Sequence, residues 1–257
     1  MNIAIIFAGG SGVRMGAGVP KQFLEINGKP ILIHTLQLFE EHEDIDKIYL
    51  AINEEYLDYA AKLVEDFRIE KVSAIVAGGE TAQDSIYHAL SKAAEENPED
   101  SIVLIHDGVR PFVSYEVICD NIDGVKNYGS AITCTQCYET ILLSKDGSTV
   151  QEMPLRKESY AAQAPQSFRL GEVLRMHEKI RATEEGYTNI VDACTLYRKL
   201  GKEPHIVLGN RGNIKVTTPE DVYMFRALIQ YKENEQTFGF GLTDRLGAKL
   251  NRYRRKK

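Results

Sequence analysis

The sequence predicts an α/β fold: a mostly parallel, twisted sheet with helices on both faces and a protruding antiparallel β-arm. Over roughly the first 110 residues, short apolar runs alternate with longer stretches of helical period, as in a parallel sheet covered by helices. From residue 131 the pattern changes to short strands around Asp146-Gly147, a hairpin turn signal. A chain of 257 residues can bury enough surface to fold without a disulfide or a structural metal.

Four strands are expected in the first part of the chain, because each is an apolar run of strand length. They cover residues 1–8, 47–52, 72–76 and 102–106. Apolar residues at helical spacing predict the intervening helices over residues 31–42, 54–67 and about 84–95. Residues 9–22 are too rich in glycine for a regular element, so we expect a loop at the carboxyl end of the first strand.

The second part is expected to contain the arm and a return to the sheet. Strands are predicted over residues 131–134, 139–143, 150–153, 205–208 and 213–216, and helices over about 170–182 and 192–199. Thr218 and Pro219 are typical of the start of a further helix, which we expect to end near residue 231. No repeat or low-complexity linker is found. We therefore expect one domain over residues 1–230, with the arm at about 136–160 and an extra segment over 231–257.

The net charge of −6 combines an acidic body with a basic end. Seven Lys and Arg residues and no acid lie in residues 245–257, and without these seven positive charges the rest of the chain carries −13. Such an acidic body argues against nucleic acid as the main ligand. No apolar run approaches the length of a membrane span. Four cysteines without framework spacing, and no export signal, predict a cytoplasmic protein.

The loop after the first strand carries the strongest chemical signal. Small residues there leave backbone N–H groups accessible to phosphate oxygens: Ala8, Gly9, Gly10, Ser11 and Gly12. Arg14 and Lys21 add positive charge to the same loop. Met15 stands where the dinucleotide fingerprint needs a third glycine, and there is no Walker A sequence. A simple chain reversal would explain the glycines alone, but with the two cations the loop predicts a phosphate-binding site.

Residues 9–39 resemble the signature of the CTP-dependent polyol-phosphate cytidylyltransferases. Further matches follow in the order of that family, at Gly78-Gly79 with Ser85, and over residues 106–111, 164–168 and 213–217, so the resemblance covers residues 2 to about 230. It implies a Rossmann-like, three-layer nucleotidyltransferase fold. It also implies transfer of CMP from CTP to a polyol phosphate, with release of pyrophosphate. One branch of the family uses D-ribitol 5-phosphate and another 2-C-methyl-D-erythritol 4-phosphate.

The resemblance also implies the site residues. Catalytic roles fall to three cations, Arg14, Lys21 and Lys215, which suits a reaction that needs placement and neutralisation of phosphate charge. The nucleotide would be bound by Ala8, Gly9, Gly10, Ser11, Gly12, Gly79, Ser85 and Gly108. The acceptor would be bound by Asp107, Arg110, Thr140, Arg156 and Lys215, and Asp107 would also bind Mg²⁺ or another divalent cation.

Two of these residues imply a partner subunit. Thr140 and Arg156 match arm residues of the family, which places such an arginine in the active site of a second subunit. We therefore expect a homodimer formed through the β-arm, and convergence of Arg14, Lys21, Arg110, Arg156 and Lys215 on one composite pocket. The expected ligands are CTP and a small polyol phosphate, with no nucleic acid and no membrane span.

Two departures from the family pattern leave alternatives open. Ala82 replaces an arginine that usually helps to hold the nucleotide, and Glu139 replaces an aspartate. A non-catalytic nucleotide-binding homologue is therefore one alternative. Residues 190–194, Ile-Val-Asp-Ala-Cys, are closer to the ribitol branch than to the methylerythritol branch. The sequence favours D-ribitol 5-phosphate as the acceptor, with 2-C-methyl-D-erythritol 4-phosphate as the alternative.

Overall fold

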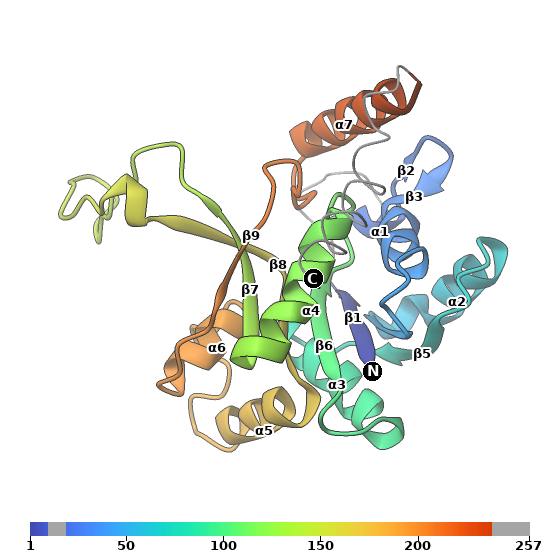
Figure 1. The fold of residues 1–257 in the computed structure, drawn as a ribbon, viewed down its shortest axis with the longest axis horizontal. Helices are drawn as coiled ribbons and strands as arrows, with labels where there is room; N and C mark the ends of the chain where they lie inside the picture. The colour runs from blue at the N-terminus through green and yellow to red at the C-terminus, as the bar shows by residue number, and fades with distance from the viewer. Residues whose placement is uncertain (10–18, 238–257) are drawn as a thin grey trace, which may run out of the picture.

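A computed structural model describes residues 1–9 and 19–237 (Figure 1). The predicted arm segment at 136–160 lies within this part, whereas the basic segment at 245–257 lies outside it. A seven-stranded sheet forms the centre, in the order β5 (Val72–Ala77), β4 (Lys47–Ile52), β1 (Asn2–Ala8), β6 (Ile102–Asp107), β8 (Tyr160–Arg169), β7 (Ser130–Gln136) and β9 (Ile206–Leu208). A separate two-stranded hairpin pairs β2 (Glu25–Ile26) with β3 (Lys29–Pro30).

The sheet is mostly parallel, as the sequence predicts. β5, β4, β1 and β6 pair in parallel, as do β7 and β9, whereas β8 runs antiparallel between β6 and β7. The carboxyl ends of all strands except β8 therefore lie at one edge of the sheet. The glycine loop after β1, the arm after β7 and the segment after β9 all leave the sheet at this carboxyl edge.

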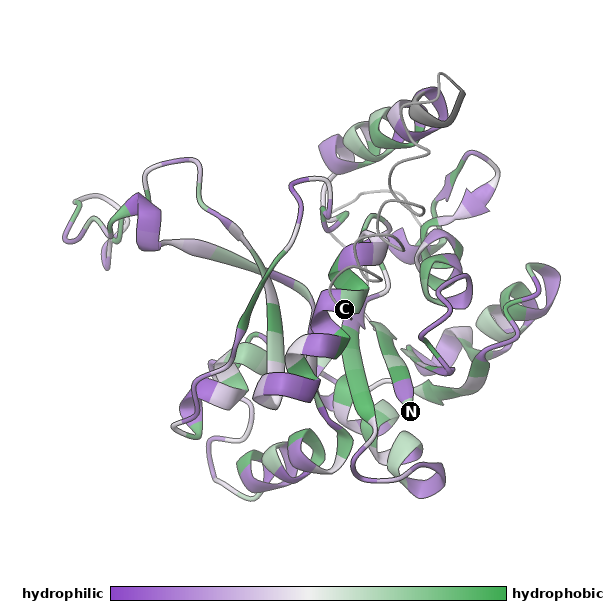
Figure 2. Ribbon diagram, viewed as in Figure 1, coloured by the Kyte–Doolittle hydropathy of each residue, from purple (hydrophilic) through white to green (hydrophobic). Residues whose placement is uncertain are grey.

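Helices cover both faces of the sheet. One face packs against α1 (Ile31–Glu40), α2 (Leu57–Asp66) and α4 (Tyr115–Tyr128). The other packs against α3 (Ala82–Glu96), α5 (Leu170–Arg181) and α6 (Ala193–Lys199). Strand β1 shows the period of two behind this arrangement, since Ala4 and Ile6 join the first core while Ile3 and Ile5 join the second. In Figure 2 the central strands are accordingly hydrophobic, and the helices carry both hydrophobic and hydrophilic residues.

Two elements escape the sequence pattern. The helix α4 and the long strand β8 were not among the predicted elements, although β8 separates the parallel part of the sheet from β7. The sequence of β8, Tyr-Ala-Ala-Gln-Ala-Pro-Gln-Ser-Phe-Arg, lacks a clear apolar alternation. Its Pro165 also lacks the N–H that a sheet ladder uses, and the register against β7 shifts between Ile132 and Cys134, opposite this stretch.

The arm protrudes from the carboxyl edge, on the left of Figure 1. Its base is antiparallel as expected, because β7 and β8 pair out to Gln136 and Tyr160. The strands predicted over 139–143 and 150–153 are wrong, since only an isolated bridge joins Leu143 to Glu152. Asp146 explains part of this difference. Its carboxylate accepts from the backbone N–H groups of Ser148 and Thr149, which forms a local turn in place of a ladder.

The last helix among the described residues, α7 (Pro219–Thr237), lies over the carboxyl edge and runs beyond the predicted end near residue 231. Phe225 on α7 packs with Phe112, Val109 and Val216 in a third apolar cluster. The strand predicted over 213–216 is wrong. The N–H of Val216 instead donates to the carbonyl of Val109, in the loop after β6, so this segment crosses the edge as irregular backbone.

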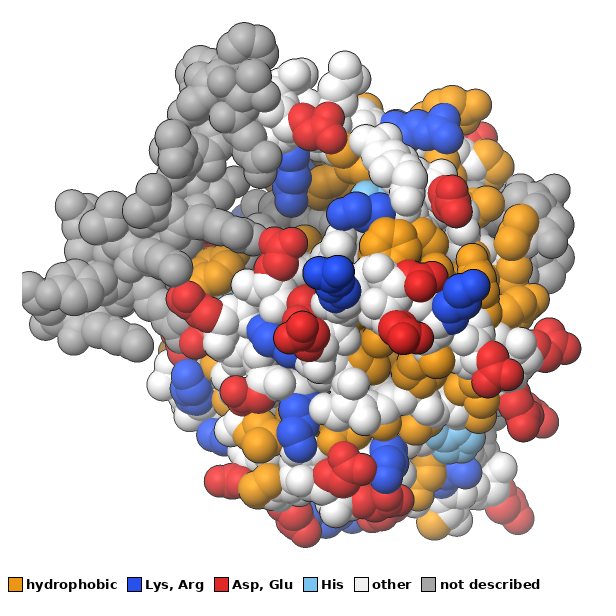
Figure 3. Space-filling model, turned by 90° about the vertical axis from the view of Figure 1, so that its right-hand side faces the viewer, with side chains coloured by type: hydrophobic (Ala, Val, Ile, Leu, Met, Phe, Trp, Pro, Cys, Tyr) orange, Lys and Arg blue, Asp and Glu red, His pale blue; other side chains and the backbone are white. Residues whose placement is uncertain are grey.

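Charged side chains of both signs lie together on the surface (Figure 3). On the face drawn in Figure 3, Lys and Arg side chains alternate with Asp and Glu. Within residues 1–9 and 19–237, none of the helices combines the length with the apolar character that crossing a bilayer requires.

A buried amide joins α4 to the two strands beneath it. The Nδ2 of Asn121 donates to the carbonyl of Val117 and to the Oγ1 of Thr133, both at 2.8 Å. Its Oδ1 accepts from the Oγ of Ser167, at 2.9 Å. Asn121 is fully buried, so these bonds have no competition from water.

We predict that Asn121→Ala lowers the free energy of unfolding by about 3 kcal/mol, because it leaves the buried hydroxyls of Thr133 and Ser167 without this partner and opens a small cavity. Asn127, exposed on the same helix, provides the matched control, and Asn127→Ala should cost less than about 0.5 kcal/mol. Urea unfolding followed by circular dichroism measures both values. Equal losses in the two variants would contradict the role of this network.

Candidate functional site

Backbone packing at the carboxyl edge leaves no room for a side chain at Gly108. Its N–H donates to the carbonyl of Phe7 at 2.9 Å, which ties the loop after β6 to the end of β1. A Cβ on Gly108 would lie 2.9 Å from the Cβ of Ala8 and 3.3 Å from the carbonyl oxygen of Phe7. The loop can therefore come this close to β1 only as glycine.

The start of α3 closes the same edge from the other side. The N–H of Gly79 donates to the Oγ of Ser85 at 3.0 Å, and a Cβ on Gly79 would lie 2.3 Å from the Cβ of Asp84. The Oγ of Ser85 would also lie 3.1 Å from a Cβ on Gly9. The structure thus brings together the described residues that the sequence assigns to the nucleotide: Ala8, Gly9, Gly79, Ser85 and Gly108. Their role in binding stays a prediction.

Lys21 lies beside this edge because a buried glutamine anchors its segment. The 3₁₀ helix η2 (Lys21–Phe23) contains Gln22, which is buried and donates from Nε2 to the carbonyl of Ala8 at 2.9 Å. Phe23 is buried too and packs against Tyr56 with ring centroids 5.2 Å apart. These two contacts fix the backbone of Lys21 next to the last residue of β1.

Asp107, the last residue of β6, is buried between two cations. Its Oδ1 lies 2.6 Å from the Nζ of Lys215, and its Oδ2 accepts from the Nε of Arg110 at 3.2 Å. The side chain of Lys215 is 42% exposed, whereas those of Asp107 and Arg110 are 9% and 11% exposed. Burial alone would raise the pKa of Asp107, but Lys215 and Arg110 outweigh it and hold this pKa below its usual value. The carboxylate is therefore ionised at neutral pH.

Two further buried side chains hold Arg110 in place. The Nη1 of Arg110 donates to the backbone carbonyl of Asn213 at 2.6 Å, and the Nδ2 of Asn213 donates to the carbonyl of Ala164 at 2.7 Å. The Nε2 of His106 lies 2.9 Å from the carbonyl of Arg110 and must donate, because a carbonyl only accepts. Burial lowers the pKa of His106 to about 4, so the ring is neutral at pH 7.

Sequence reasoning did not assign roles to Gln22, His106 and Asn213. Each lies within or beside a quoted match, but its function is to support another residue: Gln22 for Lys21, and His106 and Asn213 for Arg110. Burial is the property that reveals them, and a polar residue gives no sign of burial in a single sequence.

The remaining predicted residues are not joined to this cluster within one chain. Thr140 and Arg156 are exposed on the arm, and Arg156, in η4 (Arg156–Glu158), donates to the carbonyl of Tyr138 at 3.4 Å. Gly10, Ser11, Gly12 and Arg14 lie outside the described residues. Of the five cations expected to converge, the structure joins Arg110 to Lys215, with Lys21 beside the end of β1.

The donor atoms at the carboxyl edge suit a magnesium ion that is mostly bound by substrate. Mg²⁺ usually takes one or two carboxylates and completes its shell with phosphate oxygens and water. Asp107 offers one ionised carboxylate, whose oxygens now face Lys215 and Arg110. Lys215 is half exposed, so it can turn away and leave one oxygen to a cation.

One other group of potential ligands lies in the described part of the chain, at His42, Asp44 and Cys119. Backbone groups engage both nitrogens of this imidazole. The Nδ1 accepts from the N–H of Asp44 at 3.2 Å, and the Nε2 lies 3.3 Å from the carbonyl of Tyr115. A mixed thiol, imidazole and carboxylate set also does not suit Mg²⁺. We assign no role in nucleotide chemistry to this group.

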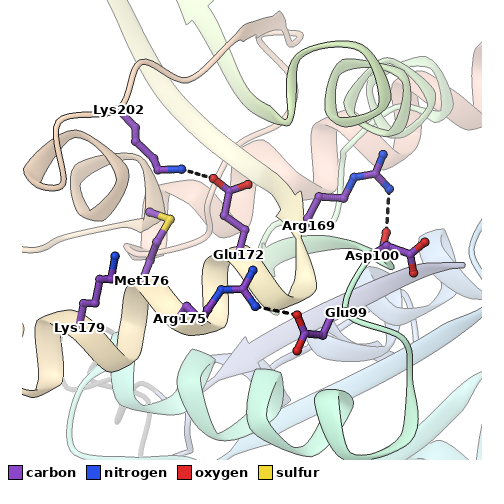
Figure 4. A pocket seen from close by; sticks show the side chains of 8 residues that line it. All are labelled: Glu99, Asp100, Arg169, Glu172, Arg175, Met176, Lys179 and Lys202. Atoms are coloured by element: carbon purple, nitrogen blue, oxygen red, sulfur yellow. Dashed lines mark hydrogen bonds and ion pairs between the residues drawn. The ribbon is translucent and has the colours of Figure 1, made fainter.

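A pocket of about 570 Å³ opens at the opposite, amino edge of the sheet, beside α5 (Figure 4). Two of its four cations are paired with acids, since Arg175 lies 2.6 Å from Glu99 and Lys202 contacts Glu172. Arg169 donates to the carbonyl of Asp100 at 2.7 Å, and Lys179 also lines the pocket. Because Glu99, Asp100 and Glu172 offset most of this positive charge, the pocket is a poorer anion site than the carboxyl edge.

Comparison with known proteins identifies the family. The family model described as IspD, 2-C-methyl-D-erythritol 4-phosphate cytidylyltransferase, matches residues 2–231. A ribitol-5-phosphate cytidylyltransferase of Streptococcus agalactiae is 47% identical over 93% of this chain and 100% of its own length. One from Vibrio parahaemolyticus is 45% identical over the same shares. A 2-C-methyl-D-erythritol 4-phosphate cytidylyltransferase of Geotalea uraniireducens is 38% identical over 91% of this chain and 98% of its own.

Solved structures agree with this assignment. The 4-diphosphocytidyl-2C-methyl-D-erythritol synthase of Anaerococcus prevotii superposes with a TM-score of 0.76 at 29% identity, and covers 90% of this chain and 96% of its own. The 2-C-methyl-D-erythritol 4-phosphate cytidylyltransferase of Francisella tularensis gives a TM-score of 0.71 at 30% identity, over 86% and 96%. With the family model matched over almost the whole described chain, the protein belongs to the 2-C-methyl-D-erythritol 4-phosphate cytidylyltransferase family.

Proposed function

We propose that this protein transfers CMP from CTP to D-ribitol 5-phosphate, giving CDP-ribitol and pyrophosphate. This choice of acceptor rests on a difference in sequence identity to two groups of relatives. A relative named for ribitol 5-phosphate is 47% identical over 93% of the chain, whereas one named for 2-C-methyl-D-erythritol 4-phosphate, from Geobacillus kaustophilus, reaches 39% over 88%. CDP-ribitol would then serve the synthesis of a cell-surface polymer.

The reaction needs little covalent help from the protein. An oxygen of the acceptor phosphate attacks the α-phosphorus of CTP and forms a new P–O bond. The bond from this phosphorus to the bridging oxygen breaks, and pyrophosphate leaves with the electron pair. No proton has to be removed, because the attacking oxygen is already anionic. The protein contributes in-line placement and positive charge, which stabilises the transition state.

The geometry of the carboxyl edge supports one role for each group. Lys215, with an exposed ammonium and a flexible side chain, would bind the acceptor phosphate. Arg110 is held by Asp107 and Asn213, so it would present its remaining guanidinium N–H groups to the acceptor at low entropic cost. Lys21, anchored through Gln22, and Arg14 would neutralise the triphosphate. Gly9, Gly79, Ser85 and Gly108 would contact the nucleotide.

A divalent cation, Mg²⁺, would bind to triphosphate oxygens and to Asp107. When bound, it withdraws charge from the phosphates and so favours attack on the α-phosphorus. Asp107 would hold the ion only after Lys215 turns towards the acceptor phosphate, since the Nζ of Lys215 now lies 2.6 Å from the Oδ1 of Asp107. Lys215 and the cation would thus occupy adjacent places in the loaded site.

The proposal includes a homodimer in which the arm of one subunit reaches the site of the other. Two features of the arm support it. Arg156 is exposed on η4, within the arm that protrudes from the sheet in Figure 1. Large apolar side chains of the arm are also exposed, as expected of a surface that packs against a partner: Tyr138, Leu142, Leu143, Val150, Met153 and Leu155.

A cytoplasmic location is part of the same proposal. All four cysteines are free thiols, which is the usual state in a reducing compartment. CTP, the proposed nucleotide substrate, is also a cytoplasmic metabolite.

Competing acceptors test the proposed function directly. With CTP and Mg²⁺, we expect pyrophosphate release with kcat/KM at least about tenfold higher for D-ribitol 5-phosphate than for 2-C-methyl-D-erythritol 4-phosphate. A coupled pyrophosphate assay measures both. The reverse order would favour the methylerythritol acceptor. Tight binding of CTP without turnover on either acceptor would favour a non-catalytic homologue, the reading that Ala82 leaves open.

Lys21→Ala tests the charge beside β1. We expect it to lower kcat by about 10²–10³, because it removes one cation that stabilises charge in the transition state. Lys62, exposed on α2, is the matched control, and Lys62→Ala should retain full activity. Pyrophosphate release under saturating substrate measures both variants, and near-normal turnover of Lys21→Ala would refute its assigned role.

Mixing two inactive variants tests the composite site. Arg156→Ala and Lys215→Met should each be nearly inactive alone, since one lacks the group that we place in the partner's site and the other lacks its own. Subunit exchange should restore about one quarter of wild-type activity, because half of the dimers carry one intact site of two. No recovery, together with monomers in analytical ultracentrifugation, would contradict the dimer proposal.

A further inference from the structure

The end of α5 is joined to the first turn of α3 through one ion pair. Arg181, the last residue of α5, donates from Nη1 to the Oδ1 of Asp84 at 2.5 Å. Its guanidinium also lies 4.3 Å from the centre of the Tyr87 ring. The pair is partly shielded, since the side chains of Arg181 and Asp84 are 38% and 22% exposed. It links two helices that are far apart in the sequence, near the carboxyl edge of the sheet.

Asp84 in turn fixes the loop before α3. Its Oδ2 accepts from the N–H and the Oγ1 of Thr81, at 3.3 and 2.7 Å, while its own N–H donates to that Oγ1 at 3.1 Å. These bonds form a reciprocal cap at the start of the helix. The Cβ of Asp84 also occupies the space that a side chain on Gly79 would need. A shift of Asp84 would therefore disturb its bonds to Thr81 and its close packing against Gly79.

The contacts of Asp84 divide between its two oxygens. Oδ2 accepts the hydrogen bonds of the helix cap, and Oδ1 accepts from Arg181. Burial tends to raise the pKa of Asp84, but the hydrogen bonds from Thr81 and Arg181 outweigh burial and lower it. The carboxylate is therefore charged over the physiological range, and both of its bonds persist there.

On the far side of Arg181, the segment between α5 and α6 completes the network. The hydroxyl of Tyr187 lies 2.6 Å from the Nδ1 of His177, which is fully buried on α5. The Arg181 guanidinium lies 5.9 Å from the Tyr187 ring. Arg181 thus lies near two aromatic rings, Tyr87 on α3 and Tyr187 in the segment after α5.

We propose that Arg181 is a positioning residue for the nucleotide: through Asp84 it holds the Gly78–Ser85 segment against the end of β1. This inference rests on the proposed function, because it takes that segment as part of the CTP site. Without Arg181, Asp84 would keep its cap bonds to Thr81 but would lose the ion pair to α5. Gly79 and Ser85 would then sample more positions, and CTP would have to order them on binding.

The test compares Arg181→Gln with Arg181→Lys, which keeps the charge, and with Arg175→Gln. Arg175 lies on the same helix, pairs with Glu99 at 2.6 Å and is far from the Gly78–Ser85 segment. We expect Arg181→Gln to weaken CTP binding about fivefold by calorimetry, with the same rise in KM for CTP. The KM for the acceptor and kcat should stay within about twofold of the wild type. Arg181→Lys should recover most of the loss, and Arg175→Gln should bind CTP normally.

A double-mutant cycle with Asp84→Asn tests whether the two residues act together. The double variant should bind CTP no more weakly than whichever single variant has the lower affinity. Unchanged CTP binding in Arg181→Gln, or an equal loss in Arg175→Gln, would overturn the inference. A fall in kcat without weaker CTP binding would do so too. Calorimetry needs no acceptor, so a wild-type protein that binds CTP without turnover contradicts only the proposed function. One that does not bind CTP contradicts both.

Discussion

The burial of Asp107 at the end of β6 is the constraint on which the carboxyl edge depends. A buried carboxylate is tolerable only when cations and hydrogen bonds replace the lost water. Arg110 supplies one cation from the adjacent turn, and Lys215 supplies the other from the segment after β9. To bring Lys215 there, that segment must cross the edge, where Asn213 and Val216 bond to β8 and to the loop after β6. One charge thus organises parts of the chain that are distant in sequence.

Strand direction explains why so many functional segments meet. A single antiparallel strand, β8, lies between two parallel groups, so β7 and β9 keep the direction of β1 and β6. The loops after β1 and β6, the arm and the Lys215 segment therefore all start at one edge. In a fully parallel sheet a crossover would have to replace the direct return of the arm through β8. The reversed strand is what allows a long arm to protrude beside the site.

The sequence predicted most of the regular elements and several residues that meet at the carboxyl edge, but not the side chains that support them. Apolar runs revealed β1, β4, β5 and β6 because these strands are buried on both faces. β8 gave no such pattern, since Gln166 and Ser167 are buried through hydrogen bonds and not through apolar contact. The outer arm was misassigned because its alternating residues have no sheet to cover. Gln22, His106 and Asn213 were not predicted as supporting residues. Their hydrogen-bond partners are backbone groups, and no pattern of side chains in the sequence encodes such bonds.

The missing side chains at Gly79 and Gly108 have a consequence for how this site can change over evolutionary time. A Cβ on either would collide with Asp84 or with the end of β1, so the wall that they form is made of main chain. Substitutions elsewhere can shift such a wall but cannot change its chemical groups, because a main-chain surface has no side chain to exchange. Divergence at this edge is therefore left to segments that reach it with side chains, such as the one before α7, which carries Lys215.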